Sequence, residues 1–277
     1  MLLLVNLGLI FLASSVLGRP SGFEPTIKRD AEANVDVDDS WKALYDGHQR
    51  YLAEMELNHP TLMKDLATNG QHPNFVVIAC SDSRVAPEMV LNTLPGTIFS
   101  ERAVANRFEA SDLHAHTTLY YAVEHLHSHH IIVMGHYGCG GVGAAIGSPP
   151  AEPMSMADRG IQEWVLPIRD LYASSEREEI VAFREKHASE EFIEVPEPSD
   201  PAFRALVEEN VKRNVLNVAE SDFIHEYWTN STNPSLWVHG LVYDMEYGGI
   251  VDLNITMGAP GASAPPPTHF PKWSPSA

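Results

Sequence analysis

Two cysteines and one histidine carry the most distinctive chemistry in this sequence. Cys80 ends the apolar run FVVIAC, His136 ends the apolar run IIVMGH, and Cys139 follows three residues later in a glycine-rich turn. Short runs rich in β-branched residues are typical of strands that are buried on both faces. In open α/β sheets, ligand sites form outside the carboxyl ends of the strands. We therefore expect these three side chains at one edge of a sheet.

The three residues allow two interpretations. The chain has only two cysteines, and an even number in an exported protein is compatible with a Cys80–Cys139 disulfide. Alternatively, His136 and Cys139 share one short turn, and Cys80 adds a second sulfur. A Cys2His set suits tetrahedral zinc with one position left open.

Asp82 and Arg84 stand next to Cys80 and also allow two interpretations. A surface ion pair between them would contribute little to stability. A carboxylate held by a guanidinium could instead orient a metal-bound water or compete with it.

At these residues the chain resembles the β-class carbonic anhydrases, which carry a Cys-x-Asp-x-Arg motif followed by His-x-x-Cys and glycines. The matching stretches here are CSDSR at 80–84 and HYGCGG at 136–141. The resemblance extends over residues 40–256. It departs from the family at Ala103, where an asparagine is common, at Thr97, where an acidic residue is common, and at Val77, which is tryptophan in some bacterial members with an inhibitory bicarbonate site.

The resemblance implies a role for each matching residue. Cys80, His136 and Cys139 would hold one Zn²⁺ per subunit, and Asp82 with Arg84 would form the catalytic dyad. In the family some pocket residues come from a partner subunit, which implies a homodimer or a higher homo-oligomer. The implied substrate-pocket positions are Gln71, as in plant-type members, together with Phe99, Val104, Tyr121 and Gly140.

The implied reaction is the reversible hydration of carbon dioxide to bicarbonate and a proton. Carbon dioxide is uncharged, so the reaction needs a strong nucleophile at moderate pH. Zinc supplies one by lowering the pKa of bound water from 15.7 towards about 7. We expect Asp82 to accept a hydrogen bond from the zinc-bound hydroxide, and Gln71 to donate one where negative charge develops on the substrate. Asp82 bound to zinc would instead close the site.

Two other functions stay open at this point. The same fold and metal could hydrolyse carbon disulfide or carbonyl sulfide, as some relatives in the class do. A secreted, non-catalytic module that binds zinc or protein is the second alternative, and it would leave Asp82, Arg84 and Gln71 without a purpose.

The elements predicted around these motifs define an α/β fold. Strands that alternate with amphipathic helices favour a single domain with a mainly parallel central β-sheet flanked by helices. The segment from about 176 to 201 is polar and interrupted by prolines, so we expect a surface insertion there. Predicted are a helix from Ser40 as N-cap, strands at 74–80, 97–104 and 131–136, helices near 119–126, 160–173 and 201–228, and a hairpin around 246–249.

The ends of the chain indicate export. The first residues combine an apolar run with small residues, the pattern of a signal peptide. The Lys28-Arg29 pair resembles a propeptide cleavage site. The predicted boundaries are a signal peptide at 1–18, a linker or propeptide at 19–39, the β-carbonic anhydrase-like domain at 40–257 and a disordered tail at 258–277.

The composition limits the classes of molecule that the protein is expected to bind. The chain has 37 acidic and 18 basic residues, a formal charge of −19, which opposes binding to nucleic acid or anionic lipid. Glycosylation sequons at Asn230 and Asn254 fit a secreted, extracellular protein. We expect a small-molecule substrate, no nucleic-acid partner and no membrane-spanning segment after the signal.

Overall fold

The computed structural model describes residues 37–109, 111–263, 265 and 267–273. The chain divides into two units at the Pro60–Thr61 bond, and helix α1 (Val37–Asn58) is the described element of the first unit. The predicted signal peptide and the Lys28-Arg29 pair lie outside the described residues. Ser40 is inside α1 rather than at its N-cap, so that prediction is wrong. An earlier start is favourable because Asp39 then lies in the first turn, where the helix dipole favours a negative charge.

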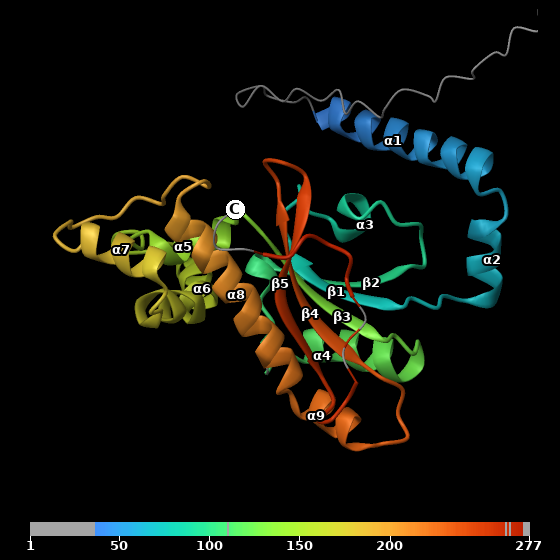
Figure 1. Ribbon diagram of the computed structural model, residues 1–277. Helices are drawn as coiled ribbons and strands as arrows, with labels where there is room; N and C mark the ends of the chain where they lie inside the picture. The colour runs from blue at the N-terminus through green and yellow to red at the C-terminus, as the bar shows by residue number, and fades with distance from the viewer. Residues whose placement is uncertain (1–36, 110, 264, 266, 274–277) are drawn as a thin grey trace, which may run out of the picture. The chain divides into compact units, whose positions relative to one another are not determined.

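The second unit contains the remaining elements, in which helices separate β1, β2, β3 and β4 along the chain and β5 follows β4 directly (Figure 1). Within the described part of the chain, no helix combines the length and the apolar character needed to cross a membrane. The elements are α2 (Leu62–Asn69), β1 (Phe75–Cys80), α3 (Pro87–Val90), β2 (Ile98–Ala103), η1 (Val104–Asn106), α4 (Leu113–Tyr120), η2 (Tyr121–His125), β3 (His130–His136), α5 (Gly140–Ile146), α6 (Met156–Ser174), α7 (Glu178–Lys186), α8 (Pro201–Ala219), α9 (Asp222–Thr229), β4 (Trp237–Asp244) and β5 (Gly249–Gly258).

The strands form one five-stranded sheet in the order β2-β1-β3-β4-β5. The first four strands are parallel to one another, and β5 returns antiparallel to β4 through the predicted hairpin. The prediction of a mainly parallel sheet flanked by helices is confirmed. Because β1 and β3 are parallel neighbours, Cys80 and His136 lie at the same edge of the sheet.

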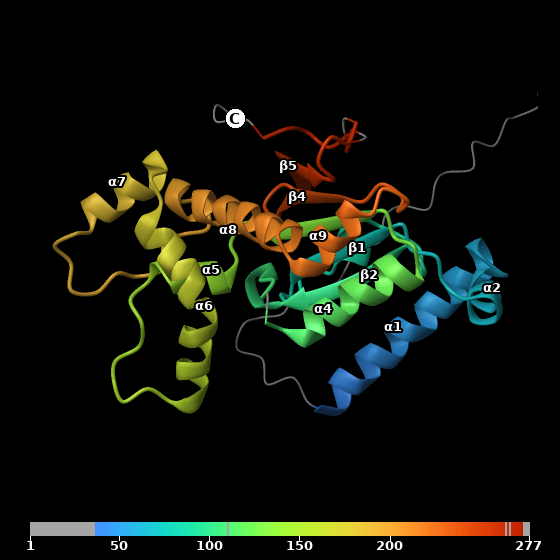
Figure 2. The same cartoon turned by 90° about the horizontal axis from the view of Figure 1, so that it is seen from below.

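Both faces of the sheet are buried, as the continuous apolar runs predict. Along β1, Val76 and Ile78 join the large core beneath the helices, whereas Val77 and Ala79 join a smaller core on the other face. Figure 2 shows α4, α8 and α9 along the helix-covered face. Helix α8 lies close to the sheet because β3 has a glycine at its contact. A Cβ on Gly135 would be 2.4 Å from a side-chain carbon of α8.

The segment from 176 to 201 is only partly a surface excursion. It contains α7, in which Ile180 and Phe183 are buried and join the main core. Their spacing of three residues places both on one helix face. The prediction underestimated this region because its apolar run, residues 180–183, is short and has charged residues on both sides.

The prediction of a disordered tail at 258–277 is corrected for Gly258, which ends β5, and for residues 270–273. Phe270 packs on the second face of the sheet. The amide of Asp252 donates to the carbonyl of Pro271, and the amide of Trp273 donates to the carbonyl of Asp252. The buried Asp252 carboxylate forms an ion pair with Lys272. The composition of the tail hides this anchor because Asp252 and Lys272 are 20 residues apart.

A histidine pair lies near the amino ends of β3 and β4. His130 Nδ1 is 3.0 Å from His239 Nε2, and His239 Nδ1 is 3.1 Å from the hydroxyl of Thr256. Burial lowers the pKa of His239 to about 4. His239 is therefore neutral in the folded protein at pH values where an exposed histidine has gained a proton.

This pKa predicts a pH-dependent stability. Between the ordinary histidine pKa of about 6.5 and about 4, the unfolded chain binds the proton and the folded chain does not. Neutral His239 therefore contributes to the free energy of unfolding above about pH 6.5. As the pH falls towards 4, about 2 to 3 kcal/mol of this contribution is lost. Urea unfolding between pH 7 and pH 4.5 measures this effect. The free energy of unfolding of His239→Asn should fall less over this range than that of the wild type. The exposed His225→Gln should keep the wild-type slope, and equal slopes for all three proteins would contradict the prediction.

Candidate metal centre

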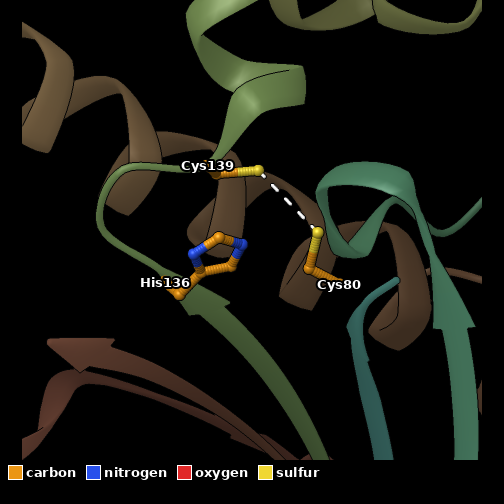
Figure 3. Close-up of side chains that lie close together, drawn as sticks. All are labelled: Cys80, His136 and Cys139. Carbon is orange, nitrogen blue, oxygen red and sulfur yellow. Dashed lines mark hydrogen bonds between the residues drawn. The ribbon is translucent and has the colours of Figure 1, made fainter. Parts of the chain in front are cut away.

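Three side chains converge at the carboxyl edge of the sheet (Figure 3). Cys80 ends β1, His136 ends β3, and Cys139 is the N-cap residue of α5. Gly138, with φ of +70°, makes the tight turn that brings Cys139 back over the strand ends. One ligand atom from each residue lies within 4.8 Å of the others, and all three residues are buried.

The His136 ring is oriented by the backbone. Its Nδ1 lies 3.1 Å from the carbonyl oxygen of Tyr137. A carbonyl can only accept, so Nδ1 carries the proton and Nε2 keeps its lone pair. Nε2 is buried and has no hydrogen-bond partner among the described residues. A metal ion is a natural partner for such a bare imidazole nitrogen beside two sulfurs.

The sulfur atoms of Cys80 and Cys139 are 3.9 Å apart, and both cysteines are free. A disulfide needs an S–S length of about 2.05 Å, so the disulfide interpretation is wrong for this structure. Two sulfurs bound tetrahedrally to zinc at about 2.3 Å would be about 3.8 Å apart. The observed separation therefore fits a shared zinc ion.

The two thiols affect each other's protonation. A hydrogen bond from Cys139 is the main cause that lowers the pKa of Cys80 to about 4, against the opposing effect of burial. The hydrogen bond to Cys80 and burial raise the pKa of Cys139. One thiolate thus forms readily, while a second buried anion beside it needs a cation. A divalent ion bound to both sulfurs meets that need.

Asp82 and Arg84 form a two-point ion pair beside this cluster. Arg84 Nε donates to Asp82 Oδ1 at 2.9 Å, and Arg84 Nη2 donates to Oδ2 at 2.6 Å. These hydrogen bonds lower the pKa of Asp82 to about 2. Asp82 Oδ2 is 3.9 Å from His136 Nε2, while the Arg84 side chain is mostly exposed. The pair therefore presents a fixed carboxylate to the cluster rather than lying wholly on the surface.

Arg102 supports the same loop, and the sequence analysis missed it. Its Nε donates to the carbonyl of Cys80 at 3.0 Å, and its Nη2 donates to the carbonyl of Asp82 at 2.7 Å. The signal available in the sequence was an arginine inside a strand, where a long charged side chain needs buried acceptors.

Comparison with known proteins identifies the family. The sequence model of the family described as carbonic anhydrase matches residues 75–250. The chain belongs to the β-class carbonic anhydrases. A carbonic anhydrase of Emericella nidulans is 31% identical over 213 residues, which cover 76% of this chain and 82% of the relative.

Solved β-carbonic anhydrases share the fold. CafA of Aspergillus fumigatus is 30% identical, with a TM-score of 0.61 over 78% of this chain and 91% of that protein. The Coccomyxa enzyme, solved in complex with acetazolamide, is 27% identical, with a TM-score of 0.63 over 78% of this chain and 86% of that protein. The similarity covers most of each chain.

The remaining predicted pocket residues of this carbonic anhydrase fall into two groups. Val104 follows β2 beside the cluster, and Gly140 follows Cys139; a Cβ on the next residue, Gly141, would be 2.8 Å from Val104. Phe99 instead pairs with Val76 and stacks on Tyr121, with ring centroids 5.9 Å apart.

Phe99 and Tyr121 therefore lie towards the amino end of the sheet, and Gln71 is exposed four residues before β1 begins. Five residue steps of strand separate Phe75 from Cys80, which is about 17 Å. The structure does not bring Gln71, Phe99 and Tyr121 to the metal cluster of their own chain. The resemblance implies that some of these residues come from a partner subunit, and their separation within one chain is compatible with that expectation, because the two ends of the same strands cannot meet.

The cluster predicts zinc binding that depends on each sulfur. The wild-type protein should bind one zinc ion per chain, and zinc should protect both thiols from a thiol reagent until a chelator removes it. Cys80→Ser should lose tight zinc binding because two ligands hold the ion far less well than three. Ser83→Ala, in the same loop, is the control and should bind as the wild type does. Metal analysis after gel filtration is the measurement, and full zinc content in Cys80→Ser would contradict the assignment.

Proposed function

We propose that this enzyme catalyses the reversible hydration of carbon dioxide to bicarbonate and a proton, with Zn²⁺ held by Cys80, His136 and Cys139. The observation that carries the proposal is the bare, buried Nε2 of His136 beside two sulfurs at the spacing of zinc ligands. Zinc, when bound, acts as a Lewis acid that makes water a nucleophile near neutral pH.

Asp82 orients the attacking water. Its carboxylate stays ionised through neutral and moderately acidic pH because the Arg84 hydrogen bonds lower its pKa to about 2. Asp82 can therefore accept a hydrogen bond from the water and leave an oxygen lone pair directed at the carbon atom. The two-point contact with Arg84 also restrains Asp82 from becoming a fourth ligand, which keeps a position open for the substrate.

We propose further that the enzyme is at least a homodimer and that each pocket is shared. Val104 and Gly140 adjoin the cluster of their own chain, whereas Gln71, Phe99 and Tyr121 lie at the opposite end of the strands. In the described sheet β2 is an edge strand. A two-fold axis beside β2 would place the amino end of one sheet next to the carboxyl end of its partner. The Gln71 amide of one chain could then donate to a substrate oxygen in the other.

We propose that the enzyme works outside the cell. The apolar first 18 residues support export, although they lie outside the described residues. Asn230 is exposed in the turn after α9, where its side chain accepts a hydrogen bond from the Thr232 hydroxyl at 2.7 Å. Expression in a glycosylating host tests this proposal. A protein that stays inside the cell with residues 1–18 attached would contradict it.

The role of Asp82 predicts a loss of activity without a loss of metal. Asp82→Asn should lower kcat/KM for carbon dioxide hydration about 10- to 100-fold, because a neutral amide is a poorer acceptor for the attacking water. Stopped-flow hydration assays at equal zinc content are the measurement. Asp170→Asn removes the same charge from an exposed position on α6 and is the matched control. A loss of less than about twofold would rule out the role.

The shared pocket predicts complementation between two defective variants. Cys80→Ser lacks its own metal site but supplies Gln71, whereas Gln71→Ala has the reverse defect. A mixed dimer would contain one complete site if Gln71 acts across the interface. Unfolding and refolding the two variants together should therefore give more activity than the average of the two refolded alone. No gain, in a sample shown to contain mixed dimers, would place Gln71 outside the partner's pocket.

A further inference from the structure

Tyr137 lies inside the metal-ligand loop, residues 136 to 139, and every part of it is held. Its amide donates to the carbonyl of Tyr243 at 3.1 Å, and its own carbonyl accepts the Nδ1 proton of His136. The ring lies under Arg204, whose Cζ is 3.5 Å from the ring centroid. The hydroxyl donates to Glu208 Oε1 at 2.8 Å.

Glu208 is a buried carboxylate on α8. It is 3% exposed, so its charge has to be balanced by protein groups rather than by water. Arg177 Nη1 donates to its second oxygen at 2.5 Å, which leaves Oε1 for the Tyr137 hydroxyl. Gly135 lets α8 approach β3 closely, which brings Glu208 within reach of the loop.

These contacts form one path from the helix layer to a metal ligand. Glu208 fixes the Tyr137 side chain, and the carbonyl of the same residue determines which nitrogen of His136 faces the two sulfurs. Removing the hydroxyl would leave a buried carboxylate oxygen without its donor, a state that proteins relieve by local rearrangement. The segment free to rearrange is the loop that carries His136 and Cys139.

We propose that the Tyr137–Glu208 hydrogen bond positions the metal-ligand loop, so that Tyr137 and Glu208 are positioning residues for the zinc site. This inference rests on the proposed zinc-dependent function. It assigns a role to two residues that touch neither the metal nor the substrate. Their contact holds His136 and Cys139 in the arrangement that the ion requires before the ion binds.

The test compares two buried tyrosine hydroxyls. Tyr137→Phe removes the hydroxyl that reaches Glu208. Tyr172→Phe removes a buried hydroxyl on α6 that has no hydrogen-bond partner among the described residues, and it is the matched control. The measurements are zinc affinity by competition with a chelator, the visible spectrum of the cobalt-substituted protein, and thermal unfolding of the metal-free protein.

Tyr137→Phe should weaken zinc affinity at least about tenfold and shift the cobalt bands, in the range typical of residues that orient metal ligands. Tyr172→Phe should change neither by more than about twofold. Two results would overturn the proposal: a Tyr137→Phe protein that loses only thermal stability, or equal losses of zinc affinity in both variants. A wild-type protein that binds no zinc would instead refute the proposed function, and that failure is visible before any variant is made.

A second variant keeps the proposal testable if Tyr137→Phe does not fold. Glu208→Gln keeps an oxygen acceptor for the hydroxyl but loses the charge, so zinc affinity should fall severalfold. If Tyr137→Phe does fold, a double-mutant cycle should show that it costs less zinc affinity in the Glu208→Gln background than in the wild type, since the hydroxyl acts through the carboxylate. Unchanged affinity in Glu208→Gln would count against the proposal, as would strict additivity in the cycle.

Discussion

Parallel pairing of β1 with β3 is the constraint on which the metal site depends. Ala79 pairs with Met134, so Cys80, one residue further along β1, and His136, two residues further along β3, lie at the same edge of the sheet. Parallel neighbours require a crossover connection, and α4 belongs to the connection between these strands. The third ligand then needs only the short turn through Gly138. The site is thus a direct product of the sheet topology.

Around the three candidate ligands, further hydrogen bonds and ion pairs restrict the conformations of the side chains and loops that carry them. Two thiolates balance the charge of a divalent ion, so a buried zinc site of this kind is neutral. Arg102 donates to the main chain of the first ligand segment, residues 80 to 82, and Arg84 holds the carboxylate of Asp82. The hydrogen bond between Tyr137 and Glu208 holds the second ligand segment, which is the metal-ligand loop of residues 136 to 139. Both segments are therefore held by hydrogen bonds that involve side chains outside the cluster.

The sequence is sufficient to predict the sheet and the cluster of Cys80, His136 and Cys139 because both depend on local signals. FVVIAC and IIVMGH indicate buried strands, and parallel neighbours end at a common edge, so Cys80 and His136 could be placed together. Asp82 and Arg84 were recognisable as a pair, but their direction was not, since two residues in one loop can face the metal or the solvent. Distances between side chains decided that point.

The contacts that prediction missed join segments far apart in the chain. Tyr137 and Glu208 are separated by 71 positions, and neither has a local pattern that indicates the other. Arg102 was missed because the carbonyls to which it donates belong to residues 22 and 20 positions earlier in the chain. The pocket residues Gln71, Phe99 and Tyr121 were named from the resemblance, but which end of the sheet they occupy depends on strand register. Export and the cleavage of residues 1–39 stay predictions.

The buried carboxylate of Asp252 also constrains the order in which parts of the sheet can fold during synthesis. Its cation, Lys272, lies 20 residues further along the chain and is therefore synthesised after β5. Until then Asp252 cannot enter the interior with its charge balanced, so β5 and the adjoining sheet edge stay accessible to water and to proteases. A nascent chain can therefore assemble the strands that carry Cys80 and His136 first, and it completes the β5 edge of the sheet only after residue 272 has been added.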